Sequence, residues 1–189
     1  WLDIIRGKTP IYGDSSSPLN EHSPLPFEDT RLLDLCAHTM WFLPNVASCD
    51  AMEALLCRPA NGFYQTYQII NCSGTKAGIG VDALGPVREA MGDNPLTTRT
   101  ITCGKLTTGV TLRPLGGLLM LRNCKSPETY FQTAFRVQSP WTATDKDDPT
   151  KKTILKPTCY VFDFAPNRAL REVVTYANQL DIDTGRRIT

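Results

Sequence analysis

Histidine is scarce in this sequence, and cysteine shows none of the spacing that metal sites need. Only His22 and His38 occur among 189 residues, so no Ser/His/Asp or Cys/His catalytic arrangement can be argued. The seven cysteines are irregularly spaced and include no C-x-x-C pair. We interpret them as buried free thiols of a reduced protein rather than as a disulfide scaffold or a zinc site.

An excess of one charge and a long apolar run are also missing. Lys and Arg number 20 against 19 Asp and Glu, which gives a net charge of +1. No broad positive field attracts nucleic acid, so a DNA contact would use local hydroxyls, backbone N–H groups and a few cations. No apolar run approaches the roughly 18 residues of a membrane span, and no signal peptide is visible. We predict a cytoplasmic protein without a membrane partner.

The composition is that of a folded domain with polar extensions. Hydrophobic residues make up 41% and charged residues 21% of the chain, as in ordinary globular proteins. Residues 1–30 are rich in Pro, Ser, Gly and Asp and are interpreted as a linker. Residues 31–181 form the predicted domain, and residues 182–189 form an exit tail. Because the chain opens on Trp1 rather than Met, we expect it to be a fragment of a longer protein.

Strand-like and helix-like patterns alternate through the predicted domain. Short apolar or β-branched runs between turn signals predict strands, and apolar residues at helical spacing predict helices. This alternation predicts an α/β fold, with a mostly parallel sheet and helices on both of its faces. The expected strands are 37–43, 64–72, 99–103, 117–122 and 158–164, and the expected helices are 46–57, 81–91, 126–137 and 165–180.

The C-terminal third carries three further expectations. The polar and charged stretch 140–157 predicts an irregular insertion. Asp163 is expected to cap the helix that follows it rather than to face a ligand. That last helix is amphipathic, and its apolar face consists of Leu170, Val173, Val174, Ala177 and Leu180.

A threonine-rich loop follows the strand expected at 99–103. Thr107, Thr108 and Thr111 offer hydroxyls to phosphate oxygens, and Gly109 would allow a close approach of the backbone. Glycine-bearing loops at the ends of parallel strands are frequent ligand sites. The alternative is an ordinary turn between strands, in which glycine serves the geometry alone.

The chain lacks a P-loop of its own. Arg6-Gly7-Lys8-Thr9 matches the end of that motif, but Leu2 stands where the first glycine is required, and Pro10 follows. No acidic Walker B cluster is evident either. Any nucleotide chemistry therefore needs groups from outside this sequence.

The helix expected at 126–137 presents a glutamine and an arginine on one face. Gln132 and Arg136 are four residues apart, which places them on neighbouring turns. A guanidinium in this position suits a phosphate, and the alternative is a solvated arginine paired with a surface acid. Ser126 as N-cap and Pro127 at the first helical position define the start of this helix.

Three segments, taken in chain order, resemble a known family. Residues 39–48, 102–111 and 130–139 resemble motifs IV, V and VI of the second, C-terminal RecA-like domain of superfamily 2 helicases of the DEAD/DEAH type. Within that family, the three segments are most similar to those of restriction-type helicases, including the translocating subunits of type I and type III restriction systems. The resemblance covers roughly residues 31–181, which is most of the chain.

Motif VI departs from the family pattern at two positions. Gln132 and Arg136 match the glutamine and first arginine of Q-x-x-G-R-x-x-R. Phe135 stands in place of its glycine, and Ser139 in place of its second arginine. That second arginine often stabilises charge on the transferred phosphate, so the identity of the arginine finger is left open.

The resemblance implies half of an ATP-driven DNA motor. In the full-length parent, an N-terminal RecA-like lobe of the same polypeptide would supply the P-loop and the acids for Mg²⁺, ATP would bind between the lobes, and single- or double-stranded DNA would be contacted through its backbone. The fragment alone would bind no cofactor and have no activity.

The resemblance also implies a role for individual residues. The implied roles are catalytic for Gln132 and Arg136, nucleotide-binding for Gly109, Thr111 and Arg136, and nucleic-acid-binding for Asn45, Ser73, Gly74, Thr107 and Thr108. We expect the guanidinium at position 136 and the loop near Thr108 to lie side by side at the carboxyl edge of the sheet.

Two other classes of protein remain as alternatives. One is a degenerate RecA-like lobe kept for protein docking, which the absent second arginine of motif VI would suit. The other is a Rossmann-type nucleotide-binding enzyme. Gly78 and Gly80 would begin its fingerprint, but Ala83 stands where the third glycine is required.

Overall fold

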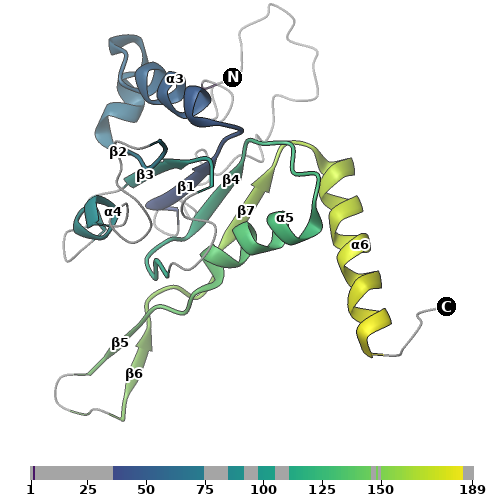
Figure 1. Ribbon diagram of the computed structural model, residues 1–189. Coiled ribbons are helices and arrows are strands. Elements are labelled where there is room, and N and C mark those ends of the chain that lie inside the picture. The colour runs from purple at the N-terminus through teal and green to yellow at the C-terminus, as the bar shows by residue number, and fades with distance from the viewer. Residues whose placement is uncertain are drawn as a thin grey trace, which may run out of the picture.

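The computed structural model describes residue 2 and residues 36–74, 85–91, 98–104, 111–145, 148 and 150–184. Strands and helices alternate along these segments, as the sequence predicts (Figure 1). The elements are β1 (His38–Phe42), α3 (Val46–Leu56), η2 (Pro59–Thr66), β2 (Gln68–Asn71), α4 (Gly85–Ala90), β3 (Thr98–Thr102), β4 (Gly117–Met120), α5 (Pro127–Ala134), η4 (Phe135–Gln138), β5 (Thr142–Thr144), β6 (Lys152–Ile154), β7 (Tyr160–Asp163) and α6 (Pro166–Thr184), where η denotes a 3₁₀ helix.

The main sheet has five strands in the order β2-β3-β1-β4-β7. Every neighbouring pair in it is parallel. All five residues of the central strand β1 are buried, as are all four of β4. Such continuous burial is typical of parallel strands that are covered on both faces. The predicted α/β class with a mostly parallel sheet is therefore confirmed.

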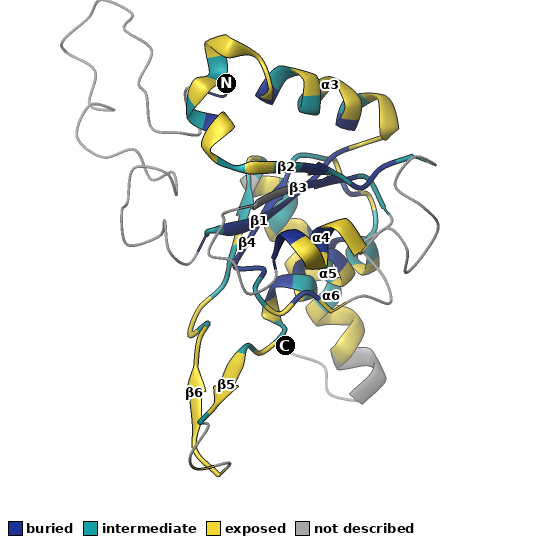
Figure 2. Cartoon of the chain, turned by 90° about the vertical axis from the view of Figure 1, so that its left-hand side faces the viewer, coloured by how far each residue is buried: buried dark blue, intermediate teal, exposed yellow. Residues whose placement is uncertain are grey.

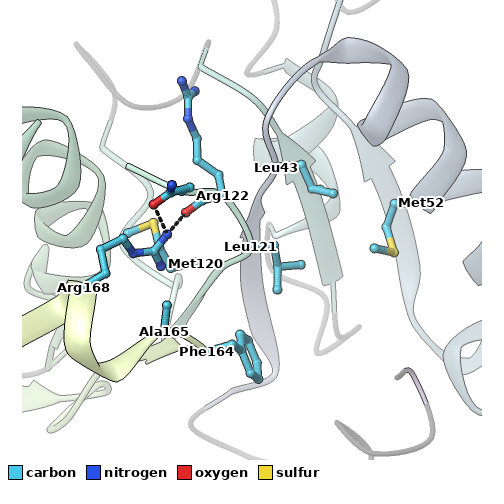
Figure 3. Close-up of a pocket in the computed structure, with 9 residues that line it drawn as sticks. Leu43, Met52, Met120, Leu121, Arg122, Phe164, Ala165 and Arg168 are labelled. Atoms are coloured by element: carbon cyan, nitrogen blue, oxygen red, sulfur yellow. Dashed lines mark hydrogen bonds between the residues drawn. The ribbon is translucent and has the colours of Figure 1, made fainter. Parts of the chain in front are cut away.

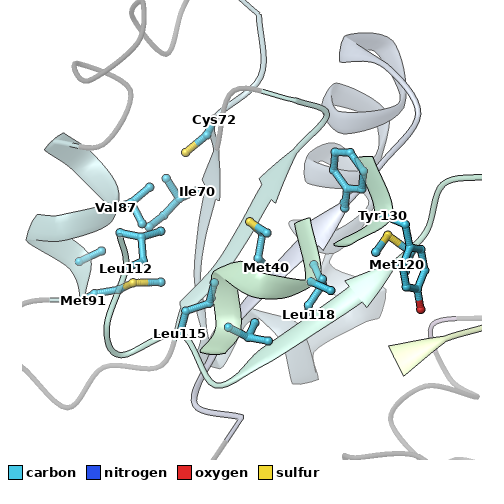
Figure 4. Close-up of a cluster of buried hydrophobic side chains, with 14 of the residues drawn as sticks. Met40, Ile70, Cys72, Val87, Met91, Leu112, Leu115, Leu118, Met120 and Tyr130 are labelled. Carbon is cyan, nitrogen blue, oxygen red and sulfur yellow. The ribbon is translucent and has the colours of Figure 1, made fainter. Parts of the chain in front are cut away.

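Helices cover both faces of the sheet, again as predicted (Figure 2). On one face, α3 and η2 pack over Trp41, Leu43, Ile101 and Leu119. On the other face, the buried cluster combines side chains from β1, β2 and β4 with side chains of α4 and α5 (Figure 4). Its largest fully buried members include Met40, Phe42, Leu115 and Leu118.

The direction of each connection decides which face its helix covers. From β1 the chain passes α3 and moves toward β2, at one edge of the sheet. From β2 to β3, and again from β4 to β7, it moves in the opposite direction, and α4 and α5 lie on the opposite face. A single hand of crossover produces this arrangement. The chain thus departs to different faces from the adjacent strands β1 and β4, which opens a crevice between their carboxyl ends.

Some local expectations differ from the structure. Residues 64–66, expected in a strand, end the 3₁₀ helix η2. The stretch 140–157, expected to be irregular, contains the antiparallel hairpin of β5 and β6, all of whose strand residues are exposed. This hairpin extends away from the sheet (Figures 1 and 2). Because neither of its faces is buried, it leaves no hydrophobic alternation in the sequence.

The last helix uses a different face from the one that its apolar pattern suggests. Tyr176 of α6 stacks on Phe131 of α5 with ring centroids 4.3 Å apart, and Ala169 packs against the core. The apolar stripe expected from the sequence stays exposed, with Leu170 at 65% and Val174 at 51% of their full accessibility. The helix also continues to Thr184, past the expected end of the domain.

Residue 2 is the one described residue of the stretch interpreted as a linker. Leu2 is buried within the cluster beneath α3 and η2. Its carbonyl oxygen accepts a 2.8 Å hydrogen bond from the hydroxyl of Tyr64. At this point the N-terminal stretch therefore packs onto the domain.

Matched leucine substitutions test this assignment of buried and exposed faces. Leu118→Ala removes a fully buried side chain from the core and is expected to lower the free energy of unfolding by about 2–5 kcal/mol. Leu170→Ala, on the exposed stripe of α6, is expected to change it by less than about 0.5 kcal/mol. Urea unfolding followed by circular dichroism measures both. Equal losses in the two variants would contradict the described packing of α6.

Candidate nucleotide and nucleic-acid sites

A pocket of about 430 Å³ occupies the carboxyl edge of the sheet, at the crevice between β1 and β4 (Figure 3). Leu43 after β1, residues 120–123 at the end of β4, and Phe164, Ala165 and Arg168 after β7 line it, together with Met52 of α3. Crevices at this point of an open parallel sheet are the usual ligand sites of α/β proteins. Its lining combines an apolar wall with two guanidinium groups.

Arg168 ties the ends of β4 and β7 together beside this pocket. Its guanidinium donates to the carbonyl oxygen of Arg122 and to Oδ1 of Asn123 (Figure 3). It also forms an ion pair with Asp163, whose side chain is only 7% exposed. Oδ1 of Asp163 accepts from the backbone N–H of Ala165, the residue before α6, so Asp163 fixes the turn that leads into the helix instead of capping the helix itself as predicted. These contacts give Arg168 a structural role, in which it joins the ends of β4 and β7.

Tyr130 brings α5 to the same ion pair. Burial is the main cause that raises the pKa of its hydroxyl, and the negative charge of Asp163 raises it further. A neutral hydroxyl beside a carboxylate avoids placing a second negative charge in the core. The N-terminal half of α5 is in this way fixed to the carboxyl edge of the sheet.

Arg122 is the cation of this edge with spare hydrogen-bonding capacity. Its Nη1 donates to the carbonyl oxygen of Cys103 at 3.2 Å, and its guanidinium carbon lies 5.1 Å from the ring centroid of Phe42. A guanidinium has five N–H donors, so one hydrogen bond and one ring contact leave others for a ligand. In the sequence, Arg122 stands out only as the last residue of an expected strand. Its position after a buried strand at the crevice is the signal that could have identified it.

Three of the expected nucleic-acid contacts come together at a neighbouring corner of the carboxyl edge. Asn45 caps α3, because its Oδ1 accepts from the backbone N–H of Ser48 at 2.8 Å. Gly74, after β2, has a φ of +65°, and a Cβ atom on it would lie 3.1 Å from Cγ1 of Val46. The backbone of residues 73–74 therefore lies directly against the N-terminus of α3. Helix N-termini offer unpaired N–H groups to phosphates.

Asn71 holds this corner in place. Its amide nitrogen donates to Asp50 and to Glu53 of α3, in both cases at 2.9 Å. Its Oδ1 accepts from the backbone N–H and from the hydroxyl of Ser73. Both the hydroxyl proton and the backbone N–H of Ser73 are thus used within the protein, so a phosphate oxygen at this corner would have to be met by the first N–H groups of α3.

The expected catalytic pair lies on α5 and η4. Ser126 caps α5, as predicted, by accepting from the backbone N–H of Thr129. Gln132 is exposed on α5, and Arg136 is half-buried in η4. Burial lowers the pKa of Arg136, which indicates a partly desolvated charge. A charge of that kind interacts with phosphate more strongly than a fully hydrated one does.

Arg136 lies at the edge of the sheet opposite to the one expected. The next residue, Val137, accepts a 2.8 Å hydrogen bond from Nζ of Lys156, and the same nitrogen donates to the carbonyl oxygen of Leu115. Leu115 stands just before β4, so this part of η4 flanks the amino edge of the sheet. The expectation of a carboxyl-edge position for Arg136 is wrong, because a helix that connects two parallel strands runs back toward their starts.

Thr111 is the described end of the threonine-rich segment. It is exposed at the amino edge, next to the buried Leu112. Leu112 belongs to the same buried cluster as Tyr130 and Val137. Residues 111–112 and the helix that carries Gln132 therefore lie on one face of the sheet. Thr107, Thr108 and Gly109 lie outside the described residues, as do Gly78 and Gly80.

Cys49 lies fully buried in α3 next to the corner formed by Asn71 and Ser73. Burial raises the pKa of its thiol to about 12, with a hydrogen bond with Ser73 opposing the shift and Cys103 adding to it. Among the described residues all seven cysteines are free thiols. In the same part of the chain no group of three or more His, Cys, Asp or Glu side chains could hold a metal ion, and no helix is long and apolar enough to span a bilayer.

Comparison with known proteins finds similarity to a protein whose name refers to restriction and methylation. No protein-family model matches it. It is 34% identical over 168 residues to a protein of Mycoplasma pneumoniae named "Putative type II restriction enzyme and methyltransferase RM.MpnORF110P C-terminus". The match covers 86% of this chain and 22% of that relative. The chain therefore spans about a fifth of the length of the curated relative that it matches.

Two arginines on α6 test the structural role of the Arg168–Asp163 pair. Arg168→Ala leaves a carboxylate that is 7% exposed without its counter-ion, and this is expected to cost about 3–5 kcal/mol of stability. Arg171→Ala, at an exposed position of the same helix, is expected to change stability by less than about 0.5 kcal/mol. Urea denaturation measures both variants. Equal stabilities would show that the ion pair does not hold α6 in place.

The raised pKa of Cys49 leads to a labelling prediction. At pH 8 a thiol with a pKa of about 12 is ionised to a fraction on the order of 10⁻⁴, and the thiolate is the reactive form. We expect Ellman's reagent to modify the exposed Cys57 rapidly and Cys49 only after unfolding. Mass spectrometry of peptides identifies the modified residue, and Cys57→Ser should remove the fast phase. Modification of Cys49 at the rate of Cys57 would contradict its described burial.

Proposed function

We propose that this chain is the second RecA-like lobe of an ATP-dependent DNA translocase or helicase that works within a restriction system. The parallel sheet with helices on both faces suits such a lobe. The restriction context is supported by the similarity to a protein named as a restriction enzyme and methyltransferase. The motor activity rests on the resemblance of three segments to helicase motifs and on the positions of their residues.

One observation carries the proposal. Leu112, next to the end of the threonine-rich segment, and Tyr130 and Ala134 of α5, the helix with Gln132, belong to one buried cluster on the same face of the parallel sheet. Motifs V and VI of the family would need this arrangement to act on one nucleotide. An antiparallel sandwich, or a placement on opposite faces, would have excluded it.

The amino edge of the sheet is the proposed nucleotide side. Arg136 would meet the charge of the terminal phosphate, and the hydroxyl of Thr111 would donate to a phosphate oxygen. ATP with Mg²⁺ would supply the phosphoryl group, and an N-terminal lobe of the same polypeptide would supply the P-loop and the metal-binding acids. In this arrangement the chain contributes positioning and positive charge to a site that two lobes complete.

The carboxyl edge is the proposed DNA side. The first N–H groups of α3, which Asn45 caps, would donate to phosphate oxygens, and residues 73–74 lie against that helix N-terminus. Arg122 adds a positive charge at the adjacent crevice. These contacts read no base sequence, which suits a motor that moves along DNA of any sequence.

Substitution of Arg136 tests the nucleotide role in the full-length parent. Loss of an arginine that stabilises the transferring phosphoryl group reduces turnover by about 10³-fold or more. We therefore expect Arg136→Ala to abolish DNA-stimulated ATP hydrolysis, measured as phosphate release, while circular dichroism and the urea midpoint stay near those of the natural protein. Arg171→Ala, exposed on α6, is the matched control and should retain full ATPase activity.

The same experiment separates the motor from a docking module. A degenerate lobe that serves only to bind another protein would show little change in ATPase activity with Arg136→Ala. Phe135 and Ser139, which depart from motif VI, are the features that would suit such a lobe. An unchanged ATPase activity would remove the support for a catalytic contribution from this chain.

A further inference from the structure

A second pocket, of about 480 Å³, lies at the amino edge of the sheet, and no motif of the sequence analysis includes most of its lining. It is formed by Arg88 and Met91 at the end of α4, by residues 111–114 before β4, and by Trp141 after η4. Its volume falls within the range of about 300–1,000 Å³ that is usual for small-ligand sites. It is therefore large enough for a nucleotide.

The floor of this pocket is rigid and apolar. Met91 and Leu112 are 5% exposed and belong to the main hydrophobic cluster, where Figure 4 shows them side by side with Val87. The backbone of Met91 is held by a 2.9 Å hydrogen bond to the carbonyl oxygen of Val87. A floor built from core side chains needs little reorganisation when a ligand binds.

Trp141 forms one wall of this pocket, and Leu155 and Lys156 hold it in place. The carbonyl oxygen of Trp141 accepts from the backbone N–H groups of Leu155 and Lys156, at 2.9 and 3.3 Å. The side chain of Lys156 bridges Leu115 and Val137 with bonds of 2.9 and 2.8 Å. Trp141 is thus anchored to the start of β4 and to the segment that carries Arg136. Its indole remains half-buried at the pocket.

Two arginine side chains line the same pocket. Arg88 and Arg113 are both exposed and both line it. No residue in its lining, which comes entirely from described segments, is acidic. Within the described part of the chain, neither guanidinium has an ion pair or a hydrogen bond to a side chain, and the ion pair found there joins Arg168 to Asp163 instead. Two such groups at one pocket favour an anionic ligand, and arginine forks match phosphate oxygens in two-point contacts.

We propose that this pocket binds a base together with its phosphate, with Trp141 as the stacking surface and Arg88 and Arg113 as the phosphate contacts. Aromatic stacking on a base tolerates any base, because every base has a π face. The hydroxyl of Thr111, at the rim, is a further donor for a phosphate or sugar oxygen. The ligand is either a free nucleoside phosphate or a nucleotide unit of a single strand, since both present the same chemistry.

That the natural ligand is ATP rests on the proposed function. The anchoring of Trp141 and of Val137 to one lysine places the pocket next to the segment of Arg136. A nucleotide whose base stacks on Trp141 would then direct its phosphates along this edge of the sheet. The pocket itself depends only on its own residues and keeps its chemistry whether or not the parent hydrolyses ATP.

Isothermal titration calorimetry on this chain tests the proposal, with ATP as one probe and a fifteen-nucleotide deoxythymidine oligomer, dT₁₅, as the other. We expect the natural chain to bind at least one of the two. Trp141→Ala and Arg113→Ala should each weaken that binding by about tenfold or more, as for the loss of a stacking or a charged hydrogen-bonding contact. Trp141→Phe should retain affinity within about threefold, because an aromatic face is preserved.

The control variant is Arg171→Ala, an exposed arginine of α6 outside the pocket, which should bind as the natural chain does. Circular dichroism and urea midpoints exclude variants that fail to fold, and Trp141→Phe covers the case in which Trp141→Ala does so. ATP binding that is lost in the variants supports a free nucleotide, and loss of dT₁₅ binding supports a strand. Undiminished binding in the folded variants, or no binding of either probe to the natural chain at millimolar concentration, overturns the proposal.

The outcome can be told apart from that of the ATPase experiment. If Arg136→Ala leaves hydrolysis unchanged in the parent while Trp141→Ala abolishes nucleotide binding to the chain, the motor proposal fails and the pocket stands. If hydrolysis depends on Arg136 but binding does not depend on Trp141 or Arg113, the pocket proposal fails and the motor stands.

Discussion

The enclosure of β1 on all sides is the constraint on which the rest of this structure depends. Its two edges pair with β3 and β4, and its two faces are covered by separate hydrophobic clusters. Met40 and Phe42 point to one cluster, while Trp41 and Leu43 belong to the other. Because a parallel strand in this position has no solvent face, its register fixes where every neighbouring strand ends. The crevice at the carboxyl edge and the cap of α3 are direct results of that register.

Helix α5 connects the two edges at which ligands are proposed. Its N-terminal half lies beside the Asp163–Arg168 pair through Tyr130, and the segment that follows it reaches the lysine that bridges Leu115 and Val137. In the proposed motor, DNA would bind near one end of α5, and the nucleotide would bind near the segment that follows its other end. A packed helix of fixed length transmits displacement between such ends without a flexible joint, which is how a small movement at one site would be felt at the other.

Structural features that depend on short-range sequence patterns could be predicted. Features that depend on which other segments pack against a helix or strand could not. The buried strands and the Ser126 cap follow from apolar runs and from a hydroxyl placed before Pro127. The exposed hairpin of β5 and β6 leaves no periodic signal. The apolar pattern of α6 identified an amphipathic helix but could not show that Ala169 and Tyr176, rather than Leu170 and Val174, would meet the core. Among the site residues, Asn45 and Gly74 could be singled out from their positions after expected strands, whereas Arg122 and Trp141 required knowledge of their neighbours in three dimensions. The expected edge for Arg136 was wrong because α5 runs back from the end of β4 toward the start of β7.

The parallel order of the sheet also sets a sequence of events during synthesis. β1 leaves the ribosome long before β3 and β4, the two strands between which it is inserted. Until both have emerged, the side chains of Met40, Trp41 and Phe42 cannot be buried as they are in the folded protein. Pairing between such distant segments is slow, and unpaired apolar strands are prone to aggregate. The nascent chain thus passes through a prolonged vulnerable stage, in which a holdase that masks this first strand would raise the yield of folded protein.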